Sequence, residues 1–394
     1  MPSTRIQLDG TSLPEFETLV DSDSHEGSLS EQGDWSIGFG QFWGGLSANV
    51  EILELNNGRM SVYVLPTRGM GIWRAECDGV PIGWQSPVKG PVHPAFVNLQ
   101  NRNGLGWLDG FDELVARCGL AFNGPPGHDD GAASPIESDI TLHGRVANLA
   151  ARDLEAIVDE EQSLLGVSGT VDEKTLFGPQ FEMRSTTWTR PGSTTFSIRD
   201  EITNVGSRPT ELELIYHNNF GKPFLSEGSV LECPTRRVVP RDARAAENIR
   251  NYQTYLGPTP GYTEQAYFFD LIADDDGETV ALLRNQAADS GIAVRFQTSQ
   301  LPCFCVWKCT QDEAAGYVTG LEPGTNFPNF KAFERHHGRV RIIEPGETYL
   351  AEIHFDVLGS AEAVGEVHER ISRLQGQFDV QLDSQPVAPY CPID

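Results

Sequence analysis

The sequence predicts an all-β fold: a large, mostly antiparallel β domain of two stacked sheets, closed by one short C-terminal helix. Segments that alternate apolar with polar residues, or that cluster β-branched residues, recur between turns from about residue 50 to residue 358. Helical periodicity is convincing in only one segment, close to the C-terminus. No low-complexity linker interrupts the strands, so we expect one β domain rather than several.

Five segments carry the clearest strand pattern. They are TFSIRDEITNV (195–205), TELELIYHNNF (210–220), SGIAVRFQTS (290–299), GRVRIIEP (338–345) and YLAEIHFDV (349–357). In the last of them, apolar side chains face one way and polar side chains the other, as in a half-buried strand. The segment 87–133 is rich in Gly, Pro and Asn instead, and we expect it to be a long irregular segment that carries either functional residues or short elements of its own.

The predicted helix is AEAVGEVHERISRLQ, residues 361–375. One stripe of this helix carries the apolar residues Val364, Val367, Ile371 and Leu374. From these patterns we expect three parts: an N-terminal arm or lid at 1–34, the β-sandwich domain at 35–358, and a C-terminal helix and tail at 359–394.

The charge of the chain excludes two classes of partner. The 394 residues carry a net charge of −27, with a pI near 4.6, whereas nucleic acids and anionic membrane surfaces attract basic proteins. No segment resembles a signal peptide or a membrane span, and the seven cysteines lack a disulfide-framework spacing. We therefore expect a reduced, cytoplasmic protein, monomeric or homodimeric, that binds a small molecule.

Three cysteines lie close together in LPCFCVWKC: Cys303, Cys305 and Cys309. They share one face of a predicted strand, so a metal site there is conceivable. We favour a buried apolar face instead, because free cysteine behaves as a small hydrophobe in protein cores. Lys308 lies in the same apolar strand, and the chain has only five lysines, which suggests a specific role for it.

The segment YVTGLEPGTNFPNF (317–330) places one acid, Glu322, in an otherwise uncharged run. We predict that Glu322 ends a strand, because a following proline favours extended backbone and Pro-Gly suits the centre of a type II turn. The segment IIEPGETY (342–349) repeats this Glu-Pro-Gly tripeptide, so the tripeptide could be ordinary hairpin chemistry. Only the first copy, however, runs into an irregular segment that is typical of a site loop.

Other polar residues lie at strand ends or beside glycines. His143 and Arg145 lie in TLHGRVANLAA, where an extended backbone would place them on one face. His217 closes the strand in LELIYHNNFGKPF, and Arg68 precedes a glycine in VLPTRGMGI. Each could be an ordinary structural residue, yet one sheet face could present them together. Trp107 offers a flat surface for stacking on a sugar ring, unless it packs in the core.

The order of the motifs is more specific than any one of them. The chain has no Walker loop, Rossmann glycine fingerprint, HExxH or GxSxG motif. Seven segments in order resemble the galactose-mutarotase-like (aldose 1-epimerase) superfamily, above all its poorly characterised aldose-epimerase-like branch of unknown function: PTRGMGI, GFDELVARCGL, LHGRVAN, YHNNFGKP, LPCFCVWK, YVTGLEPGTNFPN and IIEPGETY. The resemblance runs over roughly residues 35–358 and implies a β-supersandwich, in agreement with the strand pattern.

The resemblance implies a set of catalytic residues. Glu322 matches the family's catalytic base, and His143 and His217 match its two active-site histidines. In the implied mechanism, Glu322 removes the anomeric hydroxyl proton of a cyclic sugar and His217 protonates the ring oxygen, so that the ring opens and closes as the other anomer. His143 and Arg68 would hold the ring oxygen and hydroxyls. The site would also be lined by Trp107, Arg145, Asn219 and Lys308.

The chain departs from the family pattern in three respects. The family has an aspartate between the second histidine and the base that contacts sugar hydroxyls, and we assign no residue of this chain to that position. Arg145 replaces a glycine of the usual His-Gly-Gly, and Lys308 has no counterpart in the classical enzymes. These two cations favour an anionic or oxidised sugar, such as a uronate, a keto-sugar or a phosphate ester. We expect no cofactor.

Two alternatives stay open. The same scaffold could serve an isomerase, lyase or hydrolase of a modified sugar, with a divalent metal held by His143, His217 and Glu322, or with Lys308 as acid or base. A non-catalytic sugar-binding protein would still bind its ligand after a Glu322→Gln substitution.

Overall fold

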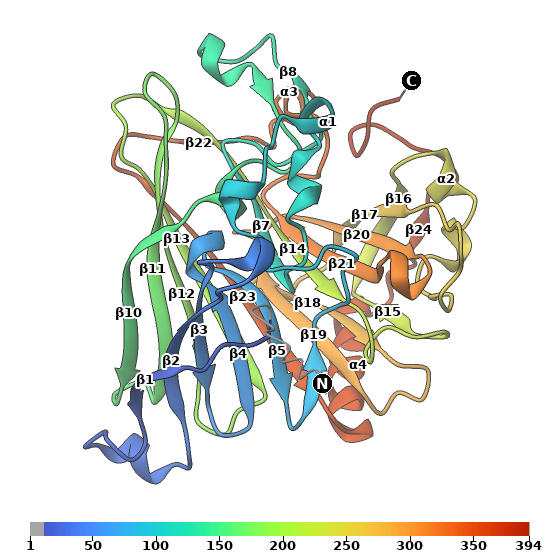
Figure 1. The fold of residues 1–394 in the computed structure, drawn as a ribbon. Coiled ribbons are helices and arrows are strands. Elements are labelled where there is room, and N and C mark those ends of the chain that lie inside the picture. The colour runs from blue at the N-terminus through green and yellow to red at the C-terminus, as the bar shows by residue number, and fades with distance from the viewer. Residues whose placement is uncertain (1–11, 394) are drawn as a thin grey trace, which may run out of the picture.

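The computed structural model describes residues 12–393, and within them two large β-sheets stack face to face around one main core (Figure 1). The predicted all-β sandwich is therefore confirmed. Residues 1–11 of the predicted N-terminal arm and residue 394 of the predicted tail lie outside the described residues. No helix within the described part of the chain is long and apolar enough to cross a membrane.

The first sheet has 14 strands. In spatial order they are β1 (Glu17–Asp21), β2 (Ser36–Gln41), β3 (Glu51–Asn56), β4 (Met60–Leu65), β5 (Gly71–Cys77), β7 (Val115–Leu120), β14 (Thr210–Phe220), β21 (Tyr317–Gly324), β20 (Cys303–Thr310), β17 (Gln265–Leu271), β16 (Thr235–Pro240) and β24 (Gln381–Leu382), with β6 (Val80–Ile82) paired to β5 and β22 (Arg341–Ile343) paired to β14. All neighbours are antiparallel except β16 and β24. The predicted N-terminal arm contributes the edge strand β1.

The second sheet has eight strands and is antiparallel throughout. In spatial order they are β10 (Ala151–Asp159), β11 (Leu164–Lys174), β12 (Gln180–Thr189), β13 (Thr195–Asn204), β23 (Thr348–Leu358), β19 (Gly291–Gln297), β18 (Glu278–Arg284) and β15 (Val230–Glu232). A separate hairpin joins β8 (Gly127–His128) to β9 (Asp139–Ile140).

The helices lie at the ends of the sandwich. The α-helices are α1 (Asn101–Gly104), α2 (Ala243–Ala246), α3 (Lys331–His336) and α4 (Ala361–Gln375). Short 3₁₀ turns are η1 (Ser28–Glu31), η2 (Gly45–Ser47), η3 (Pro66–Arg68), η4 (Pro94–Phe96), η5 (Gly106–Asp109), η6 (Pro135–Glu137), η7 (Val146–Asn148), η8 (Ile249–Asn251) and η9 (Glu313–Ala315). Figure 1 shows α1, α3 and β8 at one end and α4 at the other. The predicted helix is confirmed with its apolar stripe: Val364 and Ile371 are buried in a cluster with β18.

The core between the sheets is apolar but is crossed by one ion pair. Phe196 of β13 and Phe355 of β23 stack at 4.5 Å between ring centroids within it. Arg117 of β7 reaches from the first sheet to Asp200 of β13 in the second, with Nε 2.5 Å from Oδ2 and both side chains fully buried. Tyr216 Oη donates to the same carboxylate at 2.7 Å. Removing one partner of such a buried ion pair strongly destabilises a protein. This pair therefore holds the two sheets in one arrangement.

The alternation of side chains in β14, β21 and β20 gives the first sheet two different faces. Their inner face contributes Tyr216, Leu321, Phe304 and Val306 to the main core. Their outer face carries His217, Glu322, Cys305 and Trp307, which all line one pocket. Cys305 pairs directly with Glu322 across β20 and β21, so this register brings the predicted base beside the neighbouring strand.

All five segments with the clearest strand pattern form strands, namely β13, β14, β19, β22 and β23. The segment 87–133 contains several short elements, and one of them is β7, a fully buried central strand of the first sheet. One expectation was wrong. Glu322 does not end its strand: β21 continues to Gly324, which lacks a positive φ. Of the two Glu-Pro-Gly copies, only the second forms the expected turn, with Gly346 at a φ of 78°.

Candidate active site

A pocket of about 330 Å³ opens on the outer face of the first sheet. Its polar groups are His143, His217, Arg241, Glu264 and Glu322, and its aromatic walls are Trp107, Phe111 and Trp307. Aliphatic and small side chains complete the lining, namely Leu105, Leu108, Pro125, Leu142, Ala266, Cys305 and Pro328. Four of the predicted site residues therefore meet here: His143, His217, Glu322 and Trp107. A concave, largely apolar pocket with a few convergent polar groups is the usual form of a small-molecule site.

Glu322 lies at the floor of the pocket and is only 4% exposed. Burial raises the pKa of its carboxyl group to about 8, against a smaller lowering by Arg241. Its Oε1 atom is buried without a hydrogen-bond partner among the described residues. A carboxyl group with this pKa and a vacant acceptor atom is suited to exchanging a proton with a ligand near neutral pH.

His217 is held by a residue of its own strand. Its Nδ1 lies 2.7 Å from Asn219 Oδ1, while Asn219 Nδ2 donates to the backbone oxygens of Glu113 and His217. The amide oxygen therefore faces the ring, so Nδ1 carries the hydrogen and Nε2 presents its lone pair. That Nε2 lies 3.3 Å from Glu322 Oε1. Burial and nearby His143 lower the pKa of His217 to about 3.

These two pKa values have a joint consequence. At pH 7 Glu322, with its pKa of about 8, retains a proton, whereas His217, with its pKa of about 3, does not. Because the two groups are 3.3 Å apart, they titrate as a pair that holds one proton between them.

His143 approaches from a connecting segment rather than from a strand. Its backbone is left-handed, with a φ of 58°, and Gly144 follows with a φ of 75°. Its Nδ1 donates to the backbone oxygen of Asn123 at 2.8 Å, which leaves Nε2 as an acceptor. Burial lowers the pKa of His143 to about 4. The ring lies edge-on to Trp107 and to His217, at 4.7 Å and 5.6 Å between centroids.

Sequence reasoning missed an ion pair in this pocket. Arg241 NH2 lies 3.0 Å from Glu264 Oε1, and Trp307 Nε1 donates to Glu264 Oε2 at 2.6 Å. Arg241 is also paired with Asp242 at 3.0 Å. Glu264 lies between His217 and Glu322 in the sequence, in the interval where the family pattern has an acid. The only local feature of the sequence that could have indicated Glu264 is its position just before the apolar run of β17.

Four predicted site residues do not line this pocket. Arg68 is buried behind it, where it pairs with Glu113 at 2.5 Å. Lys308 points to the inner face of β20, and its ammonium group donates to the backbone oxygens of Tyr252 and Thr254 at 2.7 Å each. The other two are Arg145, in a separate cavity of about 180 Å³, and Asn219, which orients His217.

Metal ligation by His143, His217 and Glu322 is one of the alternatives that the sequence leaves open. Across residues 12–393, no group of three or more His, Cys, Asp or Glu side chains is arranged to hold a metal ion. Cys303 and Cys305 lie in an apolar cluster with Val239, Ala266 and Phe268, where burial raises the pKa of both thiols.

A family model and several solved structures match this chain. A family model described as "Domain of unknown function (DUF4432)" matches residues 47–357, whereas no match was found among curated proteins. A solved structure from Klebsiella pneumoniae subsp. pneumoniae, named as a candidate aldose 1-epimerase, is 34% identical and covers 95% of this chain and 95% of its own, with a TM-score of 0.89.

Two more distant structures share the fold. A galactose mutarotase-like protein from Clostridium acetobutylicum is 15% identical, covers 82% of this chain and 98% of its own, and has a TM-score of 0.57. A galactose 1-epimerase from Lactobacillus acidophilus NCFM is 12% identical, covers 83% and 99%, and has a TM-score of 0.54.

Proposed function

The chain belongs to the family described as Domain of unknown function (DUF4432), within the galactose-mutarotase-like superfamily, and on that premise we propose that it interconverts the anomers of a sugar by acid–base ring opening. The observation that carries the proposal is the pair formed by Glu322 Oε1 and His217 Nε2, 3.3 Å apart on the floor of an aromatic-walled pocket. A base and an acid must both lie within reach of one sugar ring for this reaction.

The reaction moves two protons and breaks one bond. Glu322 takes the proton of the anomeric hydroxyl while His217 gives a proton to the ring oxygen. The bond between C1 and the ring oxygen breaks as the C1 carbonyl forms, which yields the open-chain sugar. After rotation about the C1–C2 bond, the ring oxygen attacks the other face of C1 and both protons return. No atom is gained or lost, so the reaction needs no co-reactant.

The resting pair holds the number of protons that these roles require. The reaction requires Glu322 as carboxylate and His217 as imidazolium, which together hold one proton. At pH 7 the resting pair also holds one proton, on Glu322. This is the reverse of the distribution that the reaction requires, so a bound sugar must favour the form in which His217 carries the proton. The hydrogen bond from Nδ1 to Asn219 Oδ1 favours the imidazolium form of His217.

The other lining groups fit a sugar. Trp107 and Trp307 offer flat surfaces for its C–H faces. Glu264 and the Nε2 atom of His143 can accept hydrogen bonds from hydroxyl groups, and the Arg241 guanidinium can donate them.

The same groups favour a neutral sugar over an anionic one. The expectation of an anionic substrate rested on Arg145 and Lys308, which lie outside the pocket. Arg241, the cation of the pocket, is already paired with Glu264 and Asp242. A negatively charged sugar would meet a nearly neutral ion-pair cluster and the carboxyl group of Glu322 instead of an unpaired cation.

Anomer exchange measured by saturation-transfer NMR tests the proposal. The panel consists of neutral aldoses, uronates and keto-sugars, each with the wild type and with Glu322→Gln. We expect exchange with at least one neutral aldose and a loss of about 100-fold or more in Glu322→Gln, the range typical for removal of a general base. Exchange with no sugar, or exchange that survives in Glu322→Gln, would contradict the proposal and favour sugar binding or another reaction of a modified sugar.

A further inference from the structure

The two histidines of the pocket are held in different ways. His217 is held by Asn219, two residues away on β14. His143 is held instead by a strap, residues 119–124, which makes four hydrogen bonds with it and its neighbours: Gly119 N to His143 O at 3.1 Å, Arg145 N to Gly119 O at 2.9 Å, His143 N to Gly124 O at 3.1 Å, and His143 Nδ1 to Asn123 O at 2.8 Å. The position of His143 therefore depends on the position of the strap.

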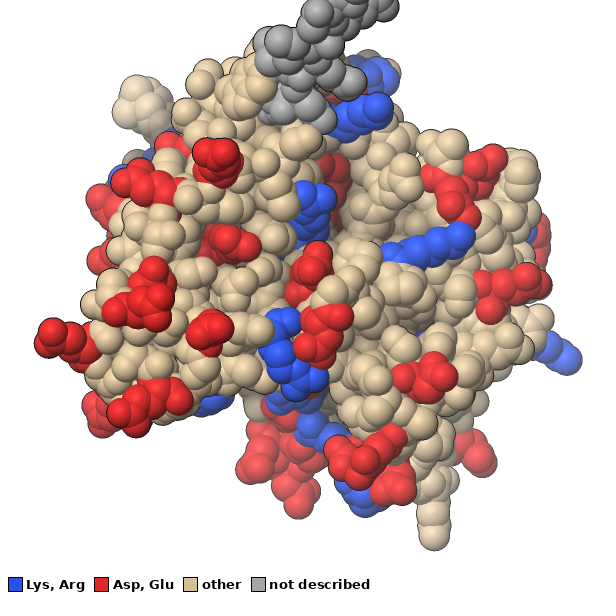
Figure 2. All heavy atoms as spheres, turned by 60° about the horizontal axis from the view of Figure 1, so that its bottom comes forward, with Lys and Arg blue, Asp and Glu red and all other residues tan. Residues whose placement is uncertain are grey.

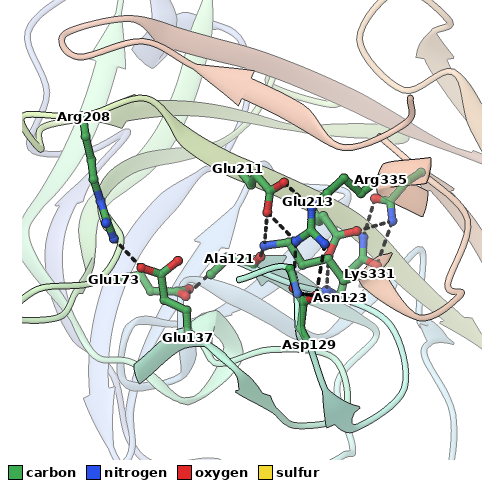
Figure 3. Close-up of polar contacts among 12 residues, drawn as sticks. Ala121, Asn123, Asp129, Glu137, Glu173, Arg208, Glu211, Glu213, Lys331 and Arg335 are labelled. Atoms are coloured by element: carbon green, nitrogen blue, oxygen red, sulfur yellow. Dashed lines mark hydrogen bonds and ion pairs between the residues drawn. The ribbon is translucent and has the colours of Figure 1, made fainter. Parts of the chain in front are cut away.

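Buried charged side chains hold the strap in turn (Figure 3). Glu173 accepts from the backbone nitrogens of Leu120 and Ala121 at 2.8 Å and 3.3 Å, and Lys331 donates to the backbone oxygen of Ala121 at 2.7 Å. Glu213 Oε2 accepts from the backbone nitrogen of Asn123 at 3.3 Å. Of these contacts, the one from Glu213 reaches the residue that binds the His143 ring.

Glu213 also reaches the chain segment that follows Glu322. Asn326 Nδ2 donates to Glu213 Oε1 at 2.8 Å, and the side chains of Asn123 and Asn326 bond each other at 2.8 Å and 3.2 Å. Glu213 and Asn123 are 0% exposed and Asn326 is 1% exposed. Burial raises the pKa of Glu213 to about 8, and a buried carboxyl group is costly unless its hydrogen bonds are made, so we expect these side chains to tolerate little displacement.

We propose that Glu213 is a positioning residue, which holds Asn123 so that the imidazole of His143 keeps its orientation relative to Glu322. Glu213 is not among the residues that line the pocket, so it acts through Asn123 and Asn326. The kinetic part of this inference rests on the proposed function, whereas the orientation of His143 does not.

The Glu213→Gln variant tests the proposal with little change of shape. A glutamine can turn its oxygen toward Asn326 Nδ2 and keep that bond, but its amide nitrogen then faces the backbone N–H of Asn123 and cannot accept from it. In the other orientation the glutamine keeps the bond to Asn123 and loses the bond to Asn326, so either orientation breaks one of the two links through which Glu213 holds Asn123. Glu334→Gln is the control for the loss of a buried carboxyl group, because Glu334 is also 0% exposed and, within residues 12–393, its side chain bonds Phe327, Asn329 and Arg339 rather than Asn123.

The first measurement is the ¹⁵N NMR spectrum of the imidazole groups in the free protein, with the His143 signal assigned from His143→Asn. In the wild type and in Glu334→Gln we expect His143 to be protonated at Nδ1. In Glu213→Gln we expect a mixture of Nδ1 and Nε2 tautomers for His143, with His217 unchanged. A change at both histidines, or at neither, would overturn the proposal, and this holds even if no sugar proves to be a substrate.

The second measurement is kcat for anomer exchange. We expect a decrease of about 10- to 100-fold in Glu213→Gln, as for a substrate-positioning group displaced by a fraction of an ångström, and a change of less than twofold in Glu334→Gln. An unchanged kcat in Glu213→Gln would overturn the proposal. If Glu213→Gln does not fold, the same two measurements on Asn326→Ala decide, since that variant leaves the buried carboxyl group in place and removes its second partner.

Discussion

At the scale of single residues, the proton shared by Glu322 and His217 controls the proposed reaction. Burial moves the two pKa values in opposite directions, to about 8 and about 3. The singly protonated pair is therefore the dominant form over a wide interval around neutral pH.

The pH dependence of kcat/KM follows from this pair. Above about pH 8 the pair loses its only proton, so His217 has none to give and kcat/KM should fall by about tenfold per pH unit. Below about pH 4, protonation of His143 and then of His217 should lower it again. NMR exchange rates from pH 3 to pH 10, corrected for spontaneous exchange, give the profile. A rate that keeps rising above pH 8 would mean that the carboxylate of Glu322 is sufficient without an acid.

Sequence reasoning found the residues that resemble a family motif but not those defined by sheet register. Glu322, His143, His217 and Trp107 were identified and do meet in the pocket. Lys308 was placed in an apolar strand and expected to line the site, yet the face of β20 that meets the pocket follows from the pairing of Cys305 with Glu322, which no local pattern encodes.

The ion pair of Arg241 and Glu264 was missed for the same reason. The two residues come from β16 and β17 regions that meet only after the sheet has assembled. In the sequence each is an ordinary charged residue beside a strand.

At the scale of elements, the site depends on the close approach of β14 and β21. A Cβ atom at Gly320 of β21 would lie 2.4 Å from Glu322 Oε1 and 3.2 Å from His217 Cε1. The absence of a side chain at this position therefore keeps the carboxyl group and the imidazole in contact.

We expect Gly320→Ala to fold and to lose activity. The methyl group would displace the end of the Glu322 side chain, with a loss of about 100-fold in kcat. Gly365→Ala is a suitable control, because Gly365 lies in α4 with nothing within 4 Å of its Cβ position, and alanine in a helix is favourable by roughly 0.5–1 kcal/mol. Equal kcat values for the two variants and the wild type, in proteins that melt cooperatively, would contradict this account.

Element prediction succeeded where a strand had alternating residues and failed where it was buried on both faces. The apolar residues of β23 predicted to point inward, from Ala351 to Val357, are buried. β7, with the sequence VARCGL, has no alternation because both of its faces are covered, and the glycine-rich flanks concealed it. Three strands of the second sheet (β13, β19 and β23) and α4 could thus be predicted, but not β7 at the centre of the first sheet.

At the scale of the whole molecule, the first feature is the distribution of charge on the surface. Figure 2 shows acidic side chains scattered over the visible face with basic ones among them, rather than one acidic patch. On this face the charge is distributed and defines no single acidic binding surface, while a net charge of −27 favours solubility.

The free energy of unfolding should report the buried state of Glu322. Its pKa is about 8 in the folded protein and near the ordinary 4.5 in the unfolded chain. Between these values the folded state binds the extra proton, so raising the pH destabilises the protein, by at most about 1.4 kcal/mol per pH unit for one proton. The contribution is fully present below pH 4.5 and is lost as the pH rises through 8.

The comparison of wild type with Glu322→Gln isolates this effect. Urea unfolding at pH 5, 6.5, 8 and 9 should show the wild type losing stability relative to the variant up to about pH 8, and no further change above it. A constant difference across this range would show that Glu322 has an ordinary pKa in the folded protein.

The two histidine anchors also differ in how far along the chain they reach. His217 and Asn219 are two residues apart, so their contact can form as soon as β14 is extended. His143 depends on contacts that span 20, 90 and 113 residues, through Asn123, Glu213 and Asn326. Contacts between distant segments form late because loop closure must precede them. During refolding, the contact between His217 and Asn219 should therefore form before the contacts that hold His143.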